Sequence, residues 1–369
     1  MQPAVFRPGT LAEVAQDLVD GIERATFGAV PVAVVDDWLN RHVRARLGSD
    51  LEEVVFRPGR VSAVYGLRLS DGSQVVAKVQ RGHLDPARTA SLAAAVNAQR
   101  LLSVAGYPCP SPLDGPATTD GLTATMETLL DTGAPGDGHD GATRTAIATS
   151  LAQQVQLLAT LPESERTALR DPPAWARYQQ GPWPPAHDPI FDFTTTAAEH
   201  AWLDELAARA AGVLTGPEAR RGPRVVGHSD WYCGNLRFSS TSSPPTRTGG
   251  TLGAARVQVV AVWDWDSLVH EIEPVIAGMA AASFTDGSTN GAQCPAPDEA
   301  AAFLAAYDAC RRQPFSEAEQ ASAAAAVTWT LAYNARCQID VLAMGYGLPE
   351  GPVLHALAAA PDSYIHLRW

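Results

Sequence analysis

Three oxygen-bearing side chains follow short apolar runs in the second half of the chain. Asp230 and Asn235 lie five residues apart in HSDWYCGN, and Asp264 follows the apolar run of VVAVWDWDS. Positions at or just past the end of a strand project polar side chains from a rigid scaffold into a cleft. Two oxygen ligands and a free carboxylate suit Mg²⁺, a hard cation that prefers oxygen and retains water. The pattern therefore indicates a magnesium site beside a further carboxylate.

A lone lysine is the second chemical signal. Lys78, in the stretch QVVAKVQ, is the one lysine among the 27 Lys and Arg residues of the chain. Its side chain alternates with Val75, Ala77 and Val79, so it points away from them on a strand. A compact ammonium on a flexible stem reaches between phosphate groups where a planar guanidinium fits badly. This position favours phosphate binding, and a stray surface lysine is the alternative.

The elements that position Lys78 begin with two helices. Apolar residues near helical spacing predict one helix over 10–26 and a second that starts at Asp36 or Asp37, either of which can cap it. The period then changes to that of strands in LEEVVF, SAVYGLRL and SQVVAKV, the last two separated by a turn over 70–72. We therefore predict an antiparallel meander.

A further helix and strand complete this part. Asp85 is a good N-cap and Pro86 a good first helical residue of a run that reaches Gly106. A Pro-rich connector, YPCPSPL, and one more strand, GLTATMETLL, lead into the Gly/Asp-rich loop APGDGHDG. We expect a helical extension over 1–50, a unit of antiparallel strands over 51–130 and a mainly helical part over 131–369. In the last of these, helices are predicted over 142–161, 197–214 and, as an Ala-rich pair, between Pro297 and Met344.

HSDWYCGN matches the pattern H-x-D-x-x-x-x-N, and on it the chain resembles the aminoglycoside phosphotransferase and choline kinase superfamily. These are small-molecule kinases with a protein-kinase-like fold. VVAKV resembles the lysine strand of their small lobe, and METLL resembles their hinge. The resemblance covers roughly Leu51 to Ala280 and implies an α+β, two-lobed protein-kinase-like fold. It implies that the small antiparallel-sheet lobe, over 51–130, binds the nucleotide and ends in the hinge, and that the mainly helical lobe spans 131–369.

The resemblance also implies a role for each matching residue. Asp230 would orient the acceptor hydroxyl and accept its proton, Asn235 and Asp264 would hold Mg²⁺, and Lys78 would hold the phosphates of ATP or GTP. The hinge backbone at Met126, Glu127 and Thr128 would hold the purine. Gly59 and Ser62, in RPGRVSAVYG, resemble the phosphate-covering loop, although a plain hairpin turn would look similar.

Two residues near the motif stay open. His228 fits a structural residue that braces the loop better than an acid or base, because Asp230 already supplies a carboxylate. Asp266 is either a third carboxylate on the metal side or a residue that faces solvent or a cationic substrate.

The chain departs from the family pattern at two places. The helix after the lysine strand normally supplies a glutamate that pairs with the lysine, but Ala95 stands there, and no acid occurs from Pro86 to Pro112. Of the acids that follow the metal aspartate in the family, the first is present as Glu273 and the second is replaced by Ala277.

The composition of the chain limits the kinds of binding partner and the cellular compartment that we expect. A net charge of −13 argues against nucleic acid or an anionic membrane as a partner and would suit a cationic small molecule. Five scattered cysteines without metal-ligand spacing read as reduced thiols. With no signal-like N-terminus and no long apolar run, the chain is expected to be cytoplasmic.

The sequence does not identify the acceptor. Candidate wall residues are the aromatics of an insertion over 172–192 and polar or aromatic residues of the C-terminal helices, namely Trp175, Tyr178, Trp183, Trp329, Tyr333 and Asp340, although such aromatics are more often core. We predict a Mg²⁺-dependent O-phosphotransferase acting on an antibiotic or related small metabolite. The alternative, motivated by Ala95, is a nucleotide-binding pseudokinase that acts as an interaction module. A metal-dependent hydrolase is disfavoured because clustered histidines are absent.

Overall fold

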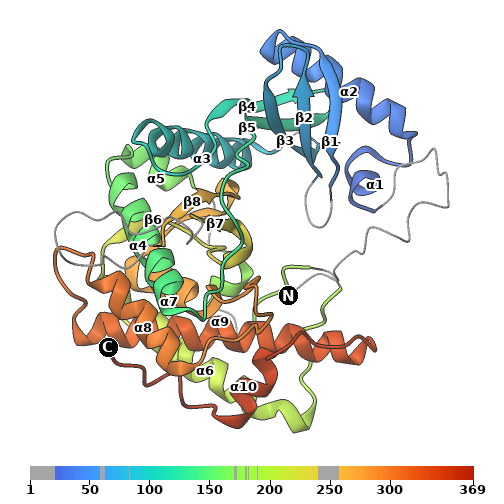
Figure 1. Cartoon of the computed structure of the whole chain (residues 1–369). Coiled ribbons are helices and arrows are strands. Elements are labelled where there is room, and N and C mark those ends of the chain that lie inside the picture. Colours follow the sequence, from blue (N-terminus) through green and yellow to red (C-terminus); the bar gives the residue numbers. More distant parts are fainter. Residues whose placement is uncertain are drawn as a thin grey trace. The chain divides into compact units, whose positions relative to one another are not determined.

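The computed structural model describes residues 21–58, 63–82, 84–169, 173–178, 181, 183–188, 190–239 and 257–369 (Figure 1). The chain divides into two compact units, which we call the sheet unit (Pro3–Asp131) and the helical unit (Thr132–Trp369).

The sheet unit contains a five-stranded antiparallel sheet in the order β1-β2-β3-β5-β4. Its elements are α1 (Gly21–Phe27), α2 (Val32–Leu47), β1 (Leu51–Phe56), β2 (Ala63–Leu69), β3 (Gln74–Arg81), α3 (Pro86–Val104), β4 (Pro112–Thr119) and β5 (Leu122–Thr128). The predicted meander is confirmed, and so is the start of α3, where Asp85 accepts a hydrogen bond from the amide of Arg88 and Pro86 is the first helical residue.

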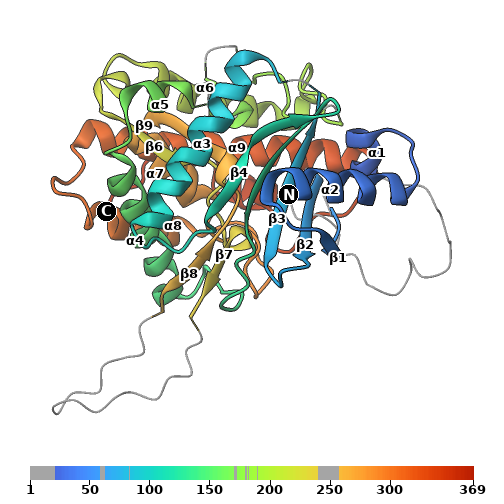
Figure 2. The ribbon, with the colours of Figure 1, turned by 90° about the horizontal axis from the view of Figure 1, so that it is seen from above.

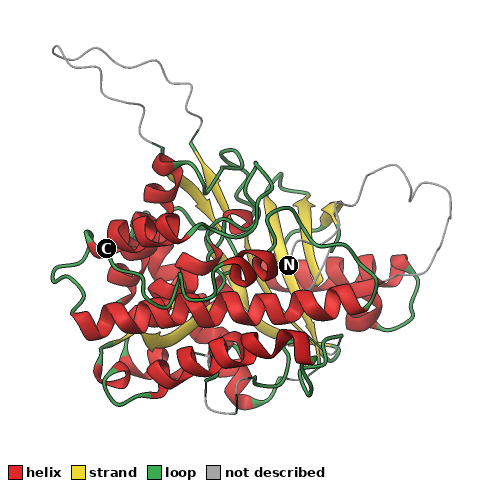
Figure 3. Ribbon diagram, turned by 90° about the horizontal axis from the view of Figure 1, so that it is seen from below, coloured by secondary structure: helices red, strands yellow, loops and turns green. Residues whose placement is uncertain are grey.

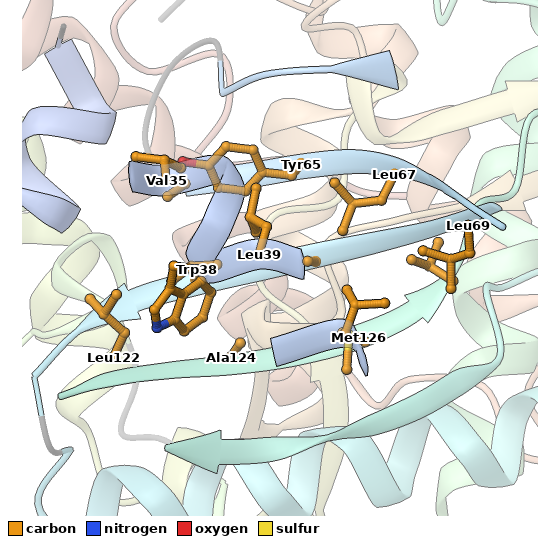
Figure 4. Close-up of a cluster of buried hydrophobic side chains, with 14 residues drawn as sticks. Val35, Trp38, Leu39, Tyr65, Leu67, Leu69, Leu122, Ala124 and Met126 are labelled. Atoms are coloured by element: carbon orange, nitrogen blue, oxygen red, sulfur yellow. The ribbon is translucent and has the colours of Figure 1, made fainter. Parts of the chain in front are cut away.

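One face of this sheet forms the core of the unit together with α2. Val35, Trp38 and Leu39 of α2 lie over Tyr65 of β2 and Met126 of β5 (Figure 4). The helices before β1 thus share one core with the sheet. Val75, Ala77 and Val79 of β3 belong to the same cluster. Because side chains alternate along a strand, Lys78 points to the opposite face, as predicted.

Two local predictions were wrong. Helix α2 begins at Val32, not at Asp36 or Asp37, and the two carboxylates bond Arg57 and Arg41 instead of capping the helix. A strand that sequence reasoning missed, β4, begins at the end of the Pro-rich connector. Its prolines are tolerated because β4 is the edge strand, where a missing amide breaks no bond to a second neighbour.

The helical unit is built around the long helix α9, which packs against α6, α7 and α10. Its helices are α4 (Gly141–Leu158), α5 (Glu163–Ala168), α6 (Ala201–Thr215), α7 (Glu273–Ser283), α8 (Pro297–Asp308), α9 (Glu317–Ala343) and α10 (Val353–Ala359). Gly278 allows the close approach of α7 to α9, since a Cβ there would lie 2.4 Å from the carbonyl oxygen of Ala323. The predicted Ala-rich helix pair is confirmed as α8 and α9.

Two short antiparallel strand pairs interrupt the helices (strands yellow in Figure 3). Strand β6 (Arg224–His228) pairs with β9 (Leu268–Ile272), and β7 (Leu236–Phe238) pairs with β8 (Val259–Val262) as a short ribbon (Figure 2). The predicted α+β class is thereby confirmed. All five cysteines are free thiols. None of the helices in the described ranges is long and apolar enough to cross a bilayer.

Candidate active site

The turn that follows β6 carries the first candidate residues, and His228 holds it in place. The His228 ring is fully buried and touches the edges of Trp231 and Trp265. Its Nδ1 accepts a hydrogen bond from the amide of Asp230 (3.2 Å), and its Nε2 donates to the carbonyl oxygen of Trp263 (3.0 Å). Both ring nitrogens therefore bond main-chain groups, which fixes the tautomer and ties this turn to the one after β8.

The turn after β8 carries Asp264 in an unusual backbone conformation. Asp264 has φ +67°, in the left-handed region that non-glycine residues rarely adopt. Ser267 supports it twice, because its Oγ donates to Asp264 Oδ2 (2.6 Å) and its amide donates to the Asp264 carbonyl oxygen (3.0 Å). The amide and hydroxyl of Ser229 both donate to the Ser267 carbonyl oxygen (3.0 and 2.8 Å). The two turns are thus joined at a second point.

Asn235 provides a third connection between the turn after β6 and the turn after β8. Its Nδ2 donates to the carbonyl oxygen (3.0 Å) and to Oδ2 (3.2 Å) of Asp230. The amide of Trp263 donates to the Asn235 carbonyl oxygen (3.1 Å). With Nδ2 occupied by Asp230, the Oδ1 of Asn235 is the atom of this amide suited to a cation. The three oxygen-bearing residues singled out in the sequence therefore come together.

The electrostatics of the site centre on Asp230. Burial, together with the negative charge of Asp264, raises the pKa of its carboxyl from 3.8 to about 7, against the bond from Asn235, which lowers it. A cation bound beside Asp230 would favour the ionised form of its carboxyl. Among the residues that the structure describes, no three His, Cys, Asp or Glu side chains form a metal-binding group.

A third carboxylate near Asp230 was missed by sequence reasoning. Asp286, in the turn after α7, also raises the pKa of Asp230. A hydrogen bond from the Cys233 amide to the Phe284 carbonyl oxygen (3.3 Å) holds this turn against the loop between β6 and β7. Gly287 has φ +73°, and a Cβ there would lie 2.8 Å from the Gly234 nitrogen. The sequence TDGS indicates only a turn, and the tertiary approach gives Asp286 its place.

In the sheet unit, Lys78 lies opposite Val64 of β2 and Thr125 of β5. The side chain of Met126 is in the core on the other face. Thr128 pairs with Ser111, its amide donating to the Ser111 carbonyl oxygen and its Oγ1 accepting from the Ser111 amide (both 2.9 Å). Gly59 and Ser62 lie outside the described residues.

The departures from the family pattern have structural explanations. Ala95 is a buried residue of α3. Glu273 begins α7 and forms a bidentate ion pair with Arg311, whose Nε and Nη2 lie 2.9 and 3.0 Å from the two carboxylate oxygens of Glu273. The Glu273 carboxylate also accepts a hydrogen bond from the Tyr307 hydroxyl. This acid therefore serves the packing of α7. Asp266 is half-buried in the turn between Asp264 and Ser267.

The aromatic residues predicted as pocket walls pack mainly against one another. Trp183 and Tyr333 lie together with Trp175 in one buried cluster, and Trp329 contacts Tyr178 edge-to-face and Trp183 with a tilted ring. Asp340 is also occupied, because it accepts bonds from Arg336 (2.6 Å) and from the amide of Asp192 (2.8 Å). These contacts join the insertion to α9.

Comparison with known proteins identifies the family. The family model of phosphotransferase enzymes matches residues 52–246, which is just over half of the chain. The chain belongs to this phosphotransferase family. The match ends before Asp264. No curated protein matches the chain.

Solved structures share the fold of this phosphotransferase at low identity. An amicoumacin kinase, hAmiN, in complex with AMP-PNP, Ca²⁺ and Ami is 11% identical, with a TM-score of 0.53 over 80% of this chain and 82% of that chain. A microcompartment-associated aminopropanol kinase is 16% identical, with a TM-score of 0.53 over 90% and 100%. The predicted kinase-like fold, with an antiparallel-sheet part and a helical part, is confirmed.

Proposed function

We propose that this phosphotransferase moves the γ-phosphoryl group of ATP or GTP to a hydroxyl of a small molecule. The observation that carries the proposal is the constellation of Asp230, Asn235 and Asp264 on two turns joined by hydrogen bonds. In this proposal residues 51–130 form the nucleotide-binding lobe and 131–369 the lobe that carries the acceptor.

Asp230 acts on the acceptor. Its carboxylate accepts a hydrogen bond from the acceptor hydroxyl, orients the oxygen toward the γ-phosphorus and takes the proton as the new P–O bond forms. The bond between the γ-phosphorus and the β,γ-bridging oxygen breaks, so the products are a phosphate ester and the nucleoside diphosphate. His228 positions the turn that carries Asp230, since both its ring nitrogens already bond main-chain groups.

The residues present fit a hard divalent cation. Asn235 Oδ1 and the Asp264 carboxylate offer only oxygen, and two carboxylates close enough to influence each other favour a positive charge. Mg²⁺ would neutralise the charge of the phosphates when bound there. Two protein ligands are enough, because Mg²⁺ usually completes its shell with water and substrate phosphates. Asp266 and Asp286 stay outside this ligand set in the proposal.

Lys78 and the end of β5 hold the nucleotide. Lys78 binds the α- and β-phosphates, and the backbone at Met126, Glu127 and Thr128 faces the purine, with Gly59 and Ser62 in the phosphate-covering loop. The amicoumacin kinase with its AMP-PNP supports an adenine nucleotide as donor. The aminopropanol kinase supports a small acceptor that carries a hydroxyl, and the net charge of −13 would suit a cationic one.

Calorimetric titration with AMP-PNP and GMP-PNP, with and without Mg²⁺, tests the proposal. We expect saturable binding of one analogue that strengthens with Mg²⁺ and weakens in Lys78→Met, followed by nucleoside diphosphate release with a panel of amino alcohols and hydroxylated antibiotics. Nucleotide binding without turnover on any acceptor would favour a pseudokinase, which the Ala95 departure suggests. No binding of either analogue would remove the proposed donor site.

A further inference from the structure

The face of the sheet that carries Lys78 also carries a buried acid. Paired residues of neighbouring strands point to the same face, so the pairs Lys78–Thr125 and Val76–Glu127 lie together on the side away from the α2 core. Glu127 is only 7% exposed. The strand that was predicted as the purine hinge therefore turns a carboxylate toward the side of the lysine.

Helix α3 holds this carboxylate through a neutral amide. Gln99 Nε2 donates to Glu127 Oε2 (2.7 Å) and to the carbonyl oxygen of Pro110 (3.0 Å). Gln99 is itself 4% exposed. Two bonds from one buried amide fix both the side chain of Gln99 and the direction of the carboxylate. Gln99 lies four residues, about one helical turn, after Ala95, on the same helix.

Lys78 is within reach of Glu127. On one sheet face, a residue and the diagonal neighbour two positions along the adjacent strand lie about 7–8 Å apart, with their Cβ atoms somewhat closer, a gap that long side chains bridge. Lys78 and Glu127 stand in this relation, because Glu127 pairs with Val76. A buried carboxylate is costly without a compensating cation, which an ammonium at this distance supplies.

The other basic side chain on this face is already engaged. Arg68 of β2 lies opposite Gln74, at the far end of β3, and its guanidinium pairs with Glu52 and Glu53 of β1. Among the described strand residues of the sheet unit, Lys78 is therefore the base placed to meet Glu127.

We infer that Glu127, oriented by Gln99, is the carboxylate that positions Lys78. The acid that helix α3 lacks at Ala95 is supplied from strand β5, and α3 contributes the amide that aims it. The ion pair itself does not depend on the proposed function, but its consequence does: positioning the ammonium for the nucleotide phosphates rests on the proposed phosphoryl transfer. Glu127 is thus a positioning residue that acts through Lys78.

The single lysine makes the pairing directly measurable. In protein grown with ¹³C,¹⁵N-lysine, the Cε resonance comes from Lys78 alone and can be followed from pH 8 upward. Removing a carboxylate that pairs with the ammonium should lower the titration midpoint of Lys78 by about one unit or more in Glu127→Gln. The matched control is Glu23→Gln, since Glu23 is another buried carboxylate of this unit and pairs with Arg57 on the core side. That variant should leave the midpoint unchanged. An unchanged midpoint in Glu127→Gln overturns the inference.

If Glu127→Gln does not fold, melting temperatures of other variants test the same pairing. Lys78→Met leaves the buried carboxylate without its cation, so it should melt at a lower temperature than the wild type. The double variant Lys78→Met/Glu127→Gln carries neither charge and should melt above Lys78→Met. A double variant that melts at the same temperature as Lys78→Met, or below it, overturns the pairing.

Nucleotide binding separates this inference from the proposed function. Glu127→Gln should bind Mg–AMP-PNP about 10-fold more weakly and adenosine as well as the wild type, because only the phosphates meet Lys78. Equal loss of both ligands would show a structural role and overturn the positioning role. If the wild type binds no nucleotide while its Lys78 midpoint still depends on Glu127, the proposed function fails and the ion pair stands.

Discussion

The two units hold their candidate residues by different means. In the sheet unit, Lys78 is an interior residue of a regular strand, paired on both sides, and strand alternation alone decides where its side chain points. In the helical unit, Asp230 and Asp264 lie in turns between strands of three to five residues, and Asp264 has a left-handed backbone. Regular structure places the lysine, whereas individual side-chain bonds place the aspartates.

This difference has a physical consequence for mutation. A strand position is fixed by many backbone bonds, so replacing the side chain of Lys78 should leave the strand in place, and a replacement that keeps the positive charge should change ligand binding and little else. The turns depend on a few bonds from His228, Ser229, Asn235 and Ser267, so losing one of them should move a carboxylate. The predictions below test that contrast.

The largest effect is expected at Asp230. Asp230→Asn keeps the size of the side chain but cannot accept the proton of the acceptor hydroxyl, so kcat should fall by about 10²–10⁴-fold. Nucleotide affinity should stay within a few-fold, since Asp230 does not touch the nucleotide in this proposal. Steady-state kinetics with an identified acceptor, together with calorimetry, measure both. Undiminished turnover would remove Asp230 from the chemistry.

Lys78→Arg is the sharper test of the strand position. The charge is kept, but the planar guanidinium is too bulky for the space between two phosphates, so we expect Mg–AMP-PNP affinity to fall by about 10-fold or more. The melting temperature should change little, and Arg68→Lys, an exchange on an exposed ion pair of the same sheet, serves as control. Equal affinity in Lys78→Arg would mean that the chain tolerates either base there.

The same contrast explains what the sequence could predict. Alternation and turn residues were enough for the strands β1, β2, β3 and β5 and for the face of Lys78. Strand β4 was missed because prolines argue against a strand, and only its place at the edge of the sheet makes them harmless. The start of α2 was misplaced because Asp36 and Asp37 do not cap the helix: Asp37 bonds Arg41 one turn further along α2, and Asp36 bonds Arg57, a partner 21 residues away.

The candidate site was predictable only in part, for a similar reason. Asp230, Asn235 and Asp264 were identified from the sequence, and the bonds from Asn235 to Asp230 show how the five-residue spacing brings these two side chains together. Asp286 and the amide of Gln99 carry no local signal, because each acquires its neighbours through contacts between distant segments. Periodicity also could not tell that Met126 turns into the core and Glu127 away from it, which depends on the register with β3.

Ser267 tests how far the aspartates depend on single bonds. Ser267→Ala removes the hydroxyl that donates to Asp264 Oδ2, so Asp264 should become less ordered and kcat/KM should fall by roughly 5–10-fold, with a higher Mg²⁺ requirement. The matched control is Ser73→Ala, which removes an equivalent serine-to-aspartate bond, 2.6 Å to Asp71 Oδ1, in the hairpin of the sheet unit. A similar loss in both variants would mean that the effect does not come from the bond that holds Asp264.

The smallest expected effect is on stability and has a pH signature. Burial raises the pKa of Asp230 above its value in the unfolded chain, so between pH 4 and about 7 the folded protein keeps a proton that the unfolded chain has lost, and stability falls as the pH rises through this window. Asp230→Asn removes that charge. In metal-free protein it should therefore raise the melting temperature by about 2–4 °C at pH 8 and leave it unchanged at pH 4, as measured by calorimetry. The variant that abolishes turnover should thus be the more stable protein. A gain of equal size at both pH values would assign the effect to packing, because the Asp230 carboxyl is already protonated at pH 4.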